Sequence, residues 1–412
     1  MTMTAALAVL ALPVAIVVGL SLGDLATSPL LRRLAVRNLR RRPGEAALAV
    51  LGSMLGTAVV CSAFVVGDTL DASLADEART QHGPIDEAVV ASGVTSLGEL
   101  EGALANPVPG SDGALSILSA PVVVTRAPNG DEGERRASPR ALLHEVDVAQ
   151  ARAFGGDEAA TGFAGIEATP DEATALVGRD LAEDLDARRG DRLQLFLYGR
   201  TLDLEVAGFV PRLGVAGFYP GAGSRSPVLF VPPGTLAEAV GDEVLVSPPL
   251  ARVLVSNEGG VLGGAEGTDE MVPRLQEVAA GVAGARIEPL KADVLDQAEA
   301  EGSAATRLLG GVGAFSVLAG VLLLVNVFVL LVEERRVELG ALRALGLRRG
   351  RLVRALGLEG GVYALAGAAG GAGLGVLIGK AVVGLTAELF ASGDAGLELR
   401  FSATWGSVLF GT

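Results

Sequence analysis

Long uncharged runs alternate with polar segments along this chain. As helices rising about 1.5 Å per residue, four of these runs can cross roughly 30 Å of hydrocarbon. They lie at Ala5–Leu22, Ala46–Val66, Leu308–Val332 and Gly360–Gly379. A fifth run begins near Ser402 and reaches Thr412, too short for a complete span, so the chain looks truncated there. The pattern predicts a multi-pass α-helical membrane protein.

The first run, Ala5–Leu22, has two interpretations. Its length is near the lower limit for a span, and it also suits the apolar core of a signal peptide. However, no lysine or arginine precedes it, and no A-x-A cleavage pattern follows. These two features favour a retained membrane span.

Arginines determine the expected orientation. Six of them lie between the first two runs, and seven lie between Glu333 and Arg354. Loops rich in Lys and Arg stay in the cytosol, so both segments are expected there. From Asp68 to Glu301, by contrast, the chain holds 39 acidic and 17 basic residues and no apolar run of spanning length. This middle segment is predicted to be a soluble domain outside the cytoplasm.

The chain is therefore expected to contain nine segments. In order these are an extra N-terminal span (1–23), a basic cytosolic segment (24–44), a span (45–67), an extracytoplasmic domain (68–305), a span (306–332), a cytosolic coupling segment (333–359), a span (360–381), an external loop (382–401) and the start of a truncated last span (402–412).

The extracytoplasmic segment mixes helical and extended patterns. Leu181 and Leu185 share one face of a short predicted helix, and alternating leucines from Leu193 to Val206 predict two strands around a Gly199-Arg200 hairpin. The remaining expectations are strands at Pro121–Val124, Val228–Val231 and Arg252–Val255, a loop at Gly259–Gly267 and a helix at Met271–Ala283. Together they predict a large α+β domain with a small barrel-like part.

One motif carries information beyond topology. The block EERRVELGALRALGLRRGRLVRALGLEG, from Glu333 to Gly360, directly follows one predicted span and precedes another. It resembles the cytosolic coupling segment of FtsX-like permeases, the family that includes MacB-type exporters. The matching positions are Glu333, Arg335, Glu338, Leu339, Gly340, Leu342, Arg343, Ala344, Leu345 and Gly346, with Glu359 as the acid that opens the next span.

Two further stretches carry the same resemblance. The basic segment contains R-N-L-R-R-R, from Arg37 to Arg42, before the first span of the permease module. The stretch Gly178–Gly208 resembles part of the MacB-like periplasmic domain, at Gly178, Leu181, Ala182, Leu185, Gly190, Asp191 and Leu193. The motifs follow the family's order along most of the chain. The extra span at Ala5–Leu22 is similar to linker spans of permeases with two modules, so this chain looks like half of such a protein.

The resemblance implies a multi-pass subunit of the cell membrane that relays ATPase motion to an extracytoplasmic domain acting on an amphiphilic substrate: a lipoprotein, lipid, peptide or drug. The implied partners are a cytosolic ABC ATP-binding subunit, a second permease copy or module, membrane lipid and an extracytoplasmic protein. One alternative is an FtsX-like relay that activates an extracellular cell-wall hydrolase without transport. Another is a membrane receptor without an ATPase.

The coupling block and the glycines also have purely structural interpretations. Seven arginines could serve only the positive-inside rule, although this does not explain the order ELGALRALG. Glycines at every fourth position favour close helix packing over a substrate path. They are Gly52 and Gly56 in the earlier span and Gly367, Gly371, Gly375 and Gly379 in the later one. Asn326 is expected to make an interhelical hydrogen bond.

Catalysis is not expected. The two histidines, His82 and His144, have no cysteine or acid at metal-ligand spacing, and no G-x-x-x-x-G-K-[ST] motif occurs, so ATP hydrolysis belongs to a separate chain and no cofactor is predicted. Cys61 is the only cysteine, which excludes a disulfide. The net charge of −15 argues against nucleic acid as a partner. Three acidic pairs are expected to be solvated surface charges: Asp76-Glu77, Asp86-Glu87 and Asp131-Glu132.

Overall fold

The structure is a computed structural model. It describes residues 43–126, 135–220, 227–240, 247–300, 311, 322, 325–326, 329–330, 332–334, 336–344, 349–391 and 401–406. The chain divides into two compact units. The helical unit comprises Met1–Ser73, Glu301–Ala391 and Glu398–Thr412, and the sheet unit comprises Leu74–Ala300 with Ser392–Leu397. Expected spans at 1–23 and 306–332 fall wholly or largely outside the described residues.

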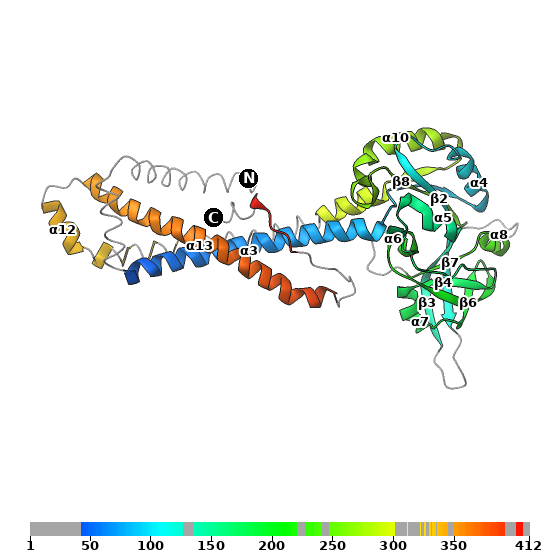
Figure 1. Cartoon of the computed structure of the whole chain (residues 1–412), viewed down its shortest axis with the longest axis horizontal. Helices are drawn as coiled ribbons and strands as arrows, with labels where there is room; N and C mark the ends of the chain where they lie inside the picture. The colour runs from blue at the N-terminus through cyan, green and yellow to red at the C-terminus, as the bar shows by residue number, and fades with distance from the viewer. Residues whose placement is uncertain are drawn as a thin grey trace. The chain divides into compact units, whose positions relative to one another are not determined.

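Three helices of the coupling and membrane regions are described: α3 (Pro43–His82), α12 (Arg336–Ala344) and α13 (Arg349–Ala391) (Figure 1). By length and composition, α3 and α13 can each cross a membrane, over Ala46–His82 and Leu352–Ala387. The expected external loop at 382–401 was wrong in its first part. α13 continues to Ala391, so residues 382–391 are helical.

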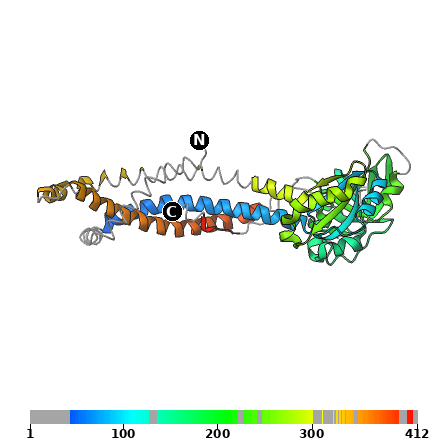
Figure 2. The same cartoon turned by 90° about the horizontal axis from the view of Figure 1, so that it is seen from above.

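α3 and α13 pack side by side in parallel (Figure 2). Near their amino ends Ala46 and Ala49 are buried with Tyr363. Further along, Val65 lies against Gly379. Contacts therefore advance in the same direction on both helices, and both amino ends lie at the same end of the pair.

The sheet unit is built on nine strands in the order β3-β7-β4-β6-β5-β2-β8-β1-β9. An additional pairing of β3 with β2 closes the first six into a ring, and β8, β1 and β9 extend from β2. The strands are β1 (Glu87–Ser92), β2 (Ser111–Arg126), β3 (Arg136–Glu145), β4 (Thr174–Gly178), β5 (Arg192–Leu197), β6 (Arg200–Val210), β7 (Val228–Val231), β8 (Leu250–Asn257) and β9 (Arg286–Glu288). This arrangement confirms the α+β prediction and its small barrel.

Short helices cover the sheet (Figure 1). They are α4 (Val94–Ala103), α5 (Val148–Ala153), η1 (Phe154–Gly156), α6 (Glu158–Thr161), α7 (Arg179–Leu185), η2 (Gly214–Gly217), α8 (Thr235–Val240), α9 (Gly260–Gly263), η3 (Gly264–Gly267), α10 (Thr268–Val278) and η4 (Ala279–Gly281). Residues 290–300 are also helical.

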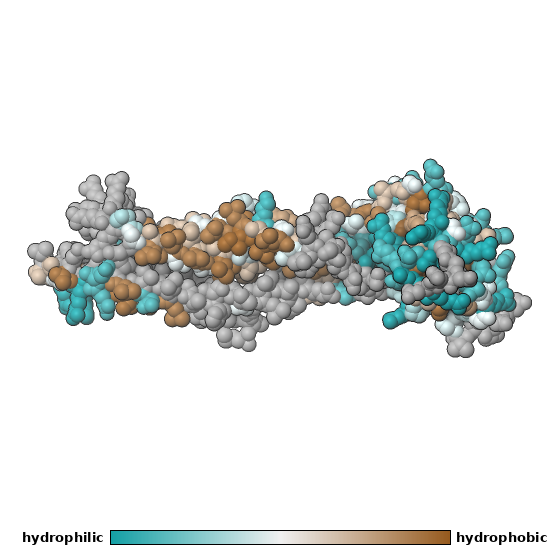
Figure 3. Space-filling view, turned by 90° about the horizontal axis from the view of Figure 1, so that it is seen from below, coloured by the Kyte–Doolittle hydropathy of each residue, from teal (hydrophilic) through white to brown (hydrophobic). Residues whose placement is uncertain are grey.

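The long strand β2 joins the ring to the extension. Its first part pairs with β8, from Ser111 to Ser119, and its last part pairs with β5, from Val123 to Arg126. Two apolar clusters result. One includes the ring interior, with Leu193, Leu195 and Val206, and the other lies under α5 and η1. Figure 3 shows hydrophilic residues over the sheet unit and apolar residues over the helical unit.

The expected loop at Gly259–Gly267 was wrong, because this stretch forms the helical turns α9 and η3. A Cβ on Gly264 would lie only 2.3 Å from Asp86 Oδ2. The absence of a side chain at this position therefore lets the turn pack directly against that carboxylate, a long-range contact that local sequence does not reveal.

Candidate functional site

The described part of the coupling segment exposes an amphipathic helix. In α12 the side chains of Arg336, Val337 and Arg343 are exposed, and Val337 is 84% accessible. A Cβ on Gly340 would meet nothing within 4 Å. Arginine is enriched at protein interfaces, so this exposed helix is open to contact with another protein.

The predicted coupling residues occupy different parts of this region. Four of them are helical and exposed: Glu333, Gly340, Arg343 and Ala344. Glu338 is a helical residue of α12. Arg335 and Gly346 fall outside the described residues. α12 ends at Ala344.

Glu359, by contrast, is buried inside α13. It retains 4% of its accessible surface, and its Oε1 accepts a hydrogen bond of 2.8 Å from the Tyr363 hydroxyl. Tyr363 packs on Ala46 and Ala49 of α3. Glu359 therefore lies in the packing between α3 and α13 near their amino ends, and it does not belong to the exposed surface of α12. Its part in coupling stays a prediction.

The four predicted glycines of α13 lie against α3. Added Cβ atoms at Gly367, Gly371, Gly375 and Gly379 would approach α3 atoms to between 2.5 and 2.9 Å. At Gly371 and Gly375 these atoms include the backbone oxygens of Met54 and Ala58. Larger side chains therefore require the two backbones to separate.

The α3 glycines occupy a different place. Gly52 and Gly56 are half-buried. Each precedes by one residue an α3 side chain, Ser53 or Thr57, that faces a glycine of α13.

A buried polar cluster lies where β1 begins. Lys291 Nζ is 2.6 Å from Asp86 Oδ1, and both side chains are fully buried. Asp86 Oδ2 accepts a hydrogen bond of 2.8 Å from the Asn257 backbone N–H. Glu87 Oε1 accepts bonds from Asn257 Nδ2 and Thr268 Oγ1, at 2.9 and 2.7 Å. The expectation that Asp86-Glu87 is a solvated surface pair was wrong, because both carboxylates are buried and bonded to partners distant in sequence.

Burial dominates the electrostatics of this cluster. It raises the pKa of Asp86 above the ordinary value, and Lys291 opposes that rise. Burial likewise raises the pKa of Glu87, against the bonds from Thr268 and Asn257. The cluster ties the residues just after α3 to the beginning of helix 290–300 and fixes this corner of the sheet unit.

A second buried polar group, His144, lies in the other apolar cluster. Its Nε2 donates to the Phe218 carbonyl at 2.8 Å, which leaves Nδ1 to accept from the Ser119 hydroxyl at 2.9 Å. The ring stacks on Phe230. Burial lowers the pKa of His144 to about 3, so the imidazole is neutral at physiological pH. Both ring nitrogens are therefore hydrogen-bonded inside this core.

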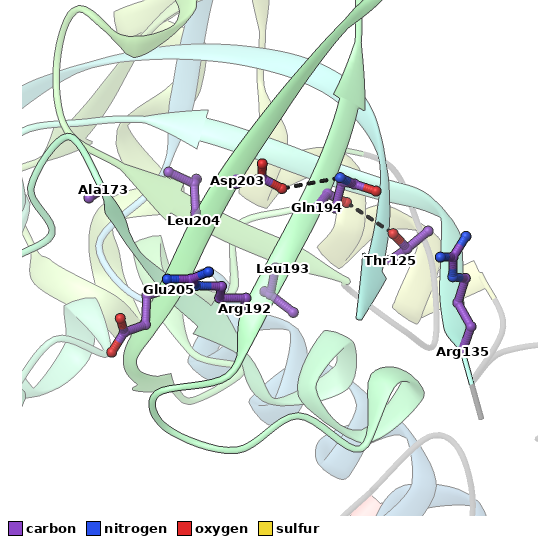
Figure 4. A pocket seen from close by; sticks show the side chains of 9 residues that line it. All are labelled: Thr125, Arg135, Ala173, Arg192, Leu193, Gln194, Asp203, Leu204 and Glu205. Carbon is purple, nitrogen blue, oxygen red and sulfur yellow. Dashed lines mark hydrogen bonds between the residues drawn. The ribbon is translucent and has the colours of Figure 1, made fainter. Parts of the chain in front are cut away.

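A surface pocket of about 460 Å³ lies on the outer side of β5 and β6 (Figure 4). Arg135, Arg192, Asp203 and Glu205 supply its charges. Gln194 Nε2 donates to Asp203 Oδ1 at 3.2 Å, and the Thr125 hydroxyl donates to the Gln194 carbonyl at 3.4 Å. These charged and hydrogen-bonding groups suit a polar ligand or protein surface, and sequence reasoning missed the pocket. Alternation along β5 and β6 gives the only sequence signal, because it places the polar residues outside.

Two family models match the chain. The MacB-like periplasmic core domain matches residues 46–260, about half of the chain. The FtsX-like permease C-terminal model matches residues 310–412. The chain belongs to the FtsX-like permease family. It is thus a membrane protein with a large α+β domain of the MacB-like periplasmic type, in a family whose members are membrane subunits of ABC systems that work with an ATP-binding subunit.

The other comparisons add little to the family assignment. A domain of a permease protein from Porphyromonas gingivalis is 16% identical, with 50% of this chain and 90% of that one covered. Its TM-score of 0.29 supports no conclusion about this permease. No curated protein matches the chain.

Proposed function

We propose that this permease is the transmembrane subunit of an ABC-type export or mechanotransmission complex. ATP binding and hydrolysis occur in a separate cytosolic subunit. The motion passes through the coupling segment into the spans and then to the extracytoplasmic domain, which acts on an amphiphilic substrate. The observation that carries this proposal is the exposed amphipathic α12 within the segment that matches the permease family.

The parallel packing of α3 and α13 supports a multi-pass topology. Two neighbouring spans that run in the same direction require the chain to recross the membrane between them. Leu308–Val332 is the one uncharged run of spanning length in that part of the sequence. Arginines at the amino end of α13 support a cytosolic position for this end of the pair.

Cysteine labelling tests this topology. Glu258→Cys lies on an exposed part of the sheet unit, and Ala344→Cys lies at the exposed end of α12. An impermeant maleimide should label Glu258→Cys in intact cells and Ala344→Cys only after permeabilisation. Cys61, the only native cysteine, is buried and provides the background control. The reverse labelling pattern would contradict the topology.

Copurification tests the ATPase partnership. The tagged permease should retain an ABC ATP-binding subunit, and Glu338→Arg should weaken that retention while expression stays normal, because an added cytosolic positive charge agrees with the topology. Glu334→Arg makes the same charge change at a position of the block that is not among the matching positions, and serves as the matched control. Retention unchanged in Glu338→Arg, or lost equally in both variants, would remove the coupling role of this motif.

The runner-up function is a relay that switches an extracellular cell-wall hydrolase without transport. It shares the cytosolic half of the mechanism and differs only outside the cell. A hydrolase captured by the sheet unit would favour it. Transfer of a lipid or lipoprotein by the reconstituted complex would favour export.

A further inference from the structure

Residues 401–404 are bound to α3 through four hydrogen bonds. Asp68 Oδ2 accepts one bond from the Thr404 backbone N–H and one from the Thr404 hydroxyl, each 2.8 Å long. The Thr69 hydroxyl accepts from the Ser402 N–H at 3.2 Å, and its proton is shared between the Val65 carbonyl at 2.8 Å and the Ser402 carbonyl at 3.0 Å. We name these four residues, Asp68, Thr69, Ser402 and Thr404, the external clamp.

The external clamp fixes the start of a helical turn. Residues 405 and 406 are helical and follow Thr404 directly. The N–H groups at a helix start have no partner within the helix, and Asp68 accepts the N–H of Thr404, the residue that precedes the turn. Here the carboxylate comes from α3, more than 300 residues earlier in sequence. The position of this turn along α3 is therefore set by Asp68.

Polarity changes at the level of the external clamp on each segment that reaches it. α3 is uncharged from Ala46 to Val66 and becomes acidic from Asp68 onward. α13 is uncharged from Gly360 to Gly379 and then presents Lys380. Lys380 Nζ lies 5.9 Å from the centre of the Phe401 ring, which brings this charge next to the clamped segment. Asp68 and Lys380, the first charged residues after these two runs, both lie near the external clamp, although α13 stays uncharged from Ala381 to Ala387.

The side chains next to the external clamp are those favoured at a membrane surface. Trp405 is 83% exposed, and Phe401 is 40% exposed. Tryptophan concentrates where hydrocarbon meets the headgroups, because its ring is apolar and its N–H is polar. Lysine at the end of a span extends its ammonium group toward the phosphates. Exposed apolar side chains, including Leu377, lie on α13 between this level and its amino end.

We propose that the external clamp holds Trp405 and Lys380 in the headgroup layer of the outer leaflet, as a phospholipid-binding belt that sets the depth of the helical unit. The occupant of this surface is a phospholipid bilayer. Exposed apolar faces, a cation and an exposed indole meet at this level, which suits the acyl chains, the glycerol region and the phosphates of one leaflet. The inference rests on the proposed topology and goes beyond the relay function.

Fluorescence gives a direct test, since Trp405 is the only tryptophan in the chain. The full chain is reconstituted in nanodiscs of phosphatidylcholine and phosphatidylglycerol. A nitroxide is placed near the headgroup, at mid-chain or at the end of the acyl chain. The headgroup-proximal label should quench Trp405 most strongly. Strongest quenching by the chain-end label overturns the proposal, as does quenching only by aqueous acrylamide. Protection from every quencher also overturns it, because another protein segment then covers Trp405.

A second experiment tests the clamp itself. Asp68→Ala removes both bonds to Thr404, and Thr404→Val removes one of them with less risk to folding. Each variant should lose the preference for the headgroup-proximal label, with the larger loss in Asp68→Ala. Asp76→Ala is the matched control, because this acid lies on α3 and makes none of the clamp's bonds. An unchanged quenching profile in Asp68→Ala overturns the clamp. The ATPase subunit is absent from this assay, so its result is independent of the coupling proposal.

Discussion

Lys291→Met should strongly destabilise the sheet unit. The substitution leaves a side chain of similar length but removes the ammonium group that lies 2.6 Å from Asp86. Asp86 then keeps the bond from the Asn257 N–H but loses its counter-charge in a site without solvent access. Removing one partner of a buried ion pair typically costs about 3–5 kcal/mol. A loss of this size is a large fraction of a domain's stability.

The loss should depend on pH. Burial already raises the pKa of Asp86, and Lys291 is the main group that opposes the rise, so its removal raises this pKa further. A carboxyl with a raised folded-state pKa contributes its stability below its ordinary pKa and loses it as pH rises through the folded-state value. The deficit of Lys291→Met relative to wild type should therefore grow from acid to alkaline pH.

Hydrogen exchange of the β1 and β8 amides in the detergent-solubilised full chain measures this effect. Adding Asp86→Asn to Lys291→Met removes the stranded charge, so the double variant should recover stability and lose the pH dependence. A deficit below about 1 kcal/mol at alkaline pH, or one equal at all pH values, would refute the argument. Such a result would mean that water reaches the pair.

Two other predictions follow from the packing. Gly375→Leu should impair assembly, because a Cβ there would lie 2.8 Å from the Ala58 carbonyl oxygen and overpacking usually costs about 1–3 kcal/mol. Gly373→Leu is the control, because a Cβ at Gly373 meets nothing within 4 Å. Size-exclusion chromatography should show normal assembly for Gly373→Leu only. Equal behaviour of the two leucine variants would contradict the packing argument. Burial lowers the pKa of His144 to about 3, so the free energy of unfolding should fall as pH drops below 6.5, the ordinary pKa of histidine. In thermal melts, the stability of His144→Gln should depend less on acid pH than that of the wild type.

Local patterns were sufficient for parts of the fold. The alternation of Leu193 and Leu195 gave β5 and its partner β6, because side chains on one strand face must share one environment. The turn itself lies at Tyr198-Gly199, one residue before the expected position, and both residues have positive φ. The spacing of Leu181 and Leu185 likewise gave α7.

Contacts between distant residues could not be predicted in the same way. Asp86 and Glu87 look like surface charges because their partners, Lys291 and Asn257, lie about 170 residues or more away. Closure of the ring depends on the pairing of β2 with β3 and on a parallel pairing of β3 with β7, neither of which has a local signal. The glycine spacing of α13 indicated a packing face, but the identity of its partner, α3, required the structure.

The central claim is that cytosolic ATP hydrolysis is coupled to this permease through α12. The most direct measurement is the ATPase rate of the ABC ATP-binding subunit alone, with the wild-type permease, and with Glu338→Arg in proteoliposomes. Loss of one interfacial charge pair can cost about 2–5 kcal/mol, enough to uncouple proteins of moderate affinity. We expect the wild-type permease to change this rate and Glu338→Arg to change it little. An identical change with both proteins would contradict it.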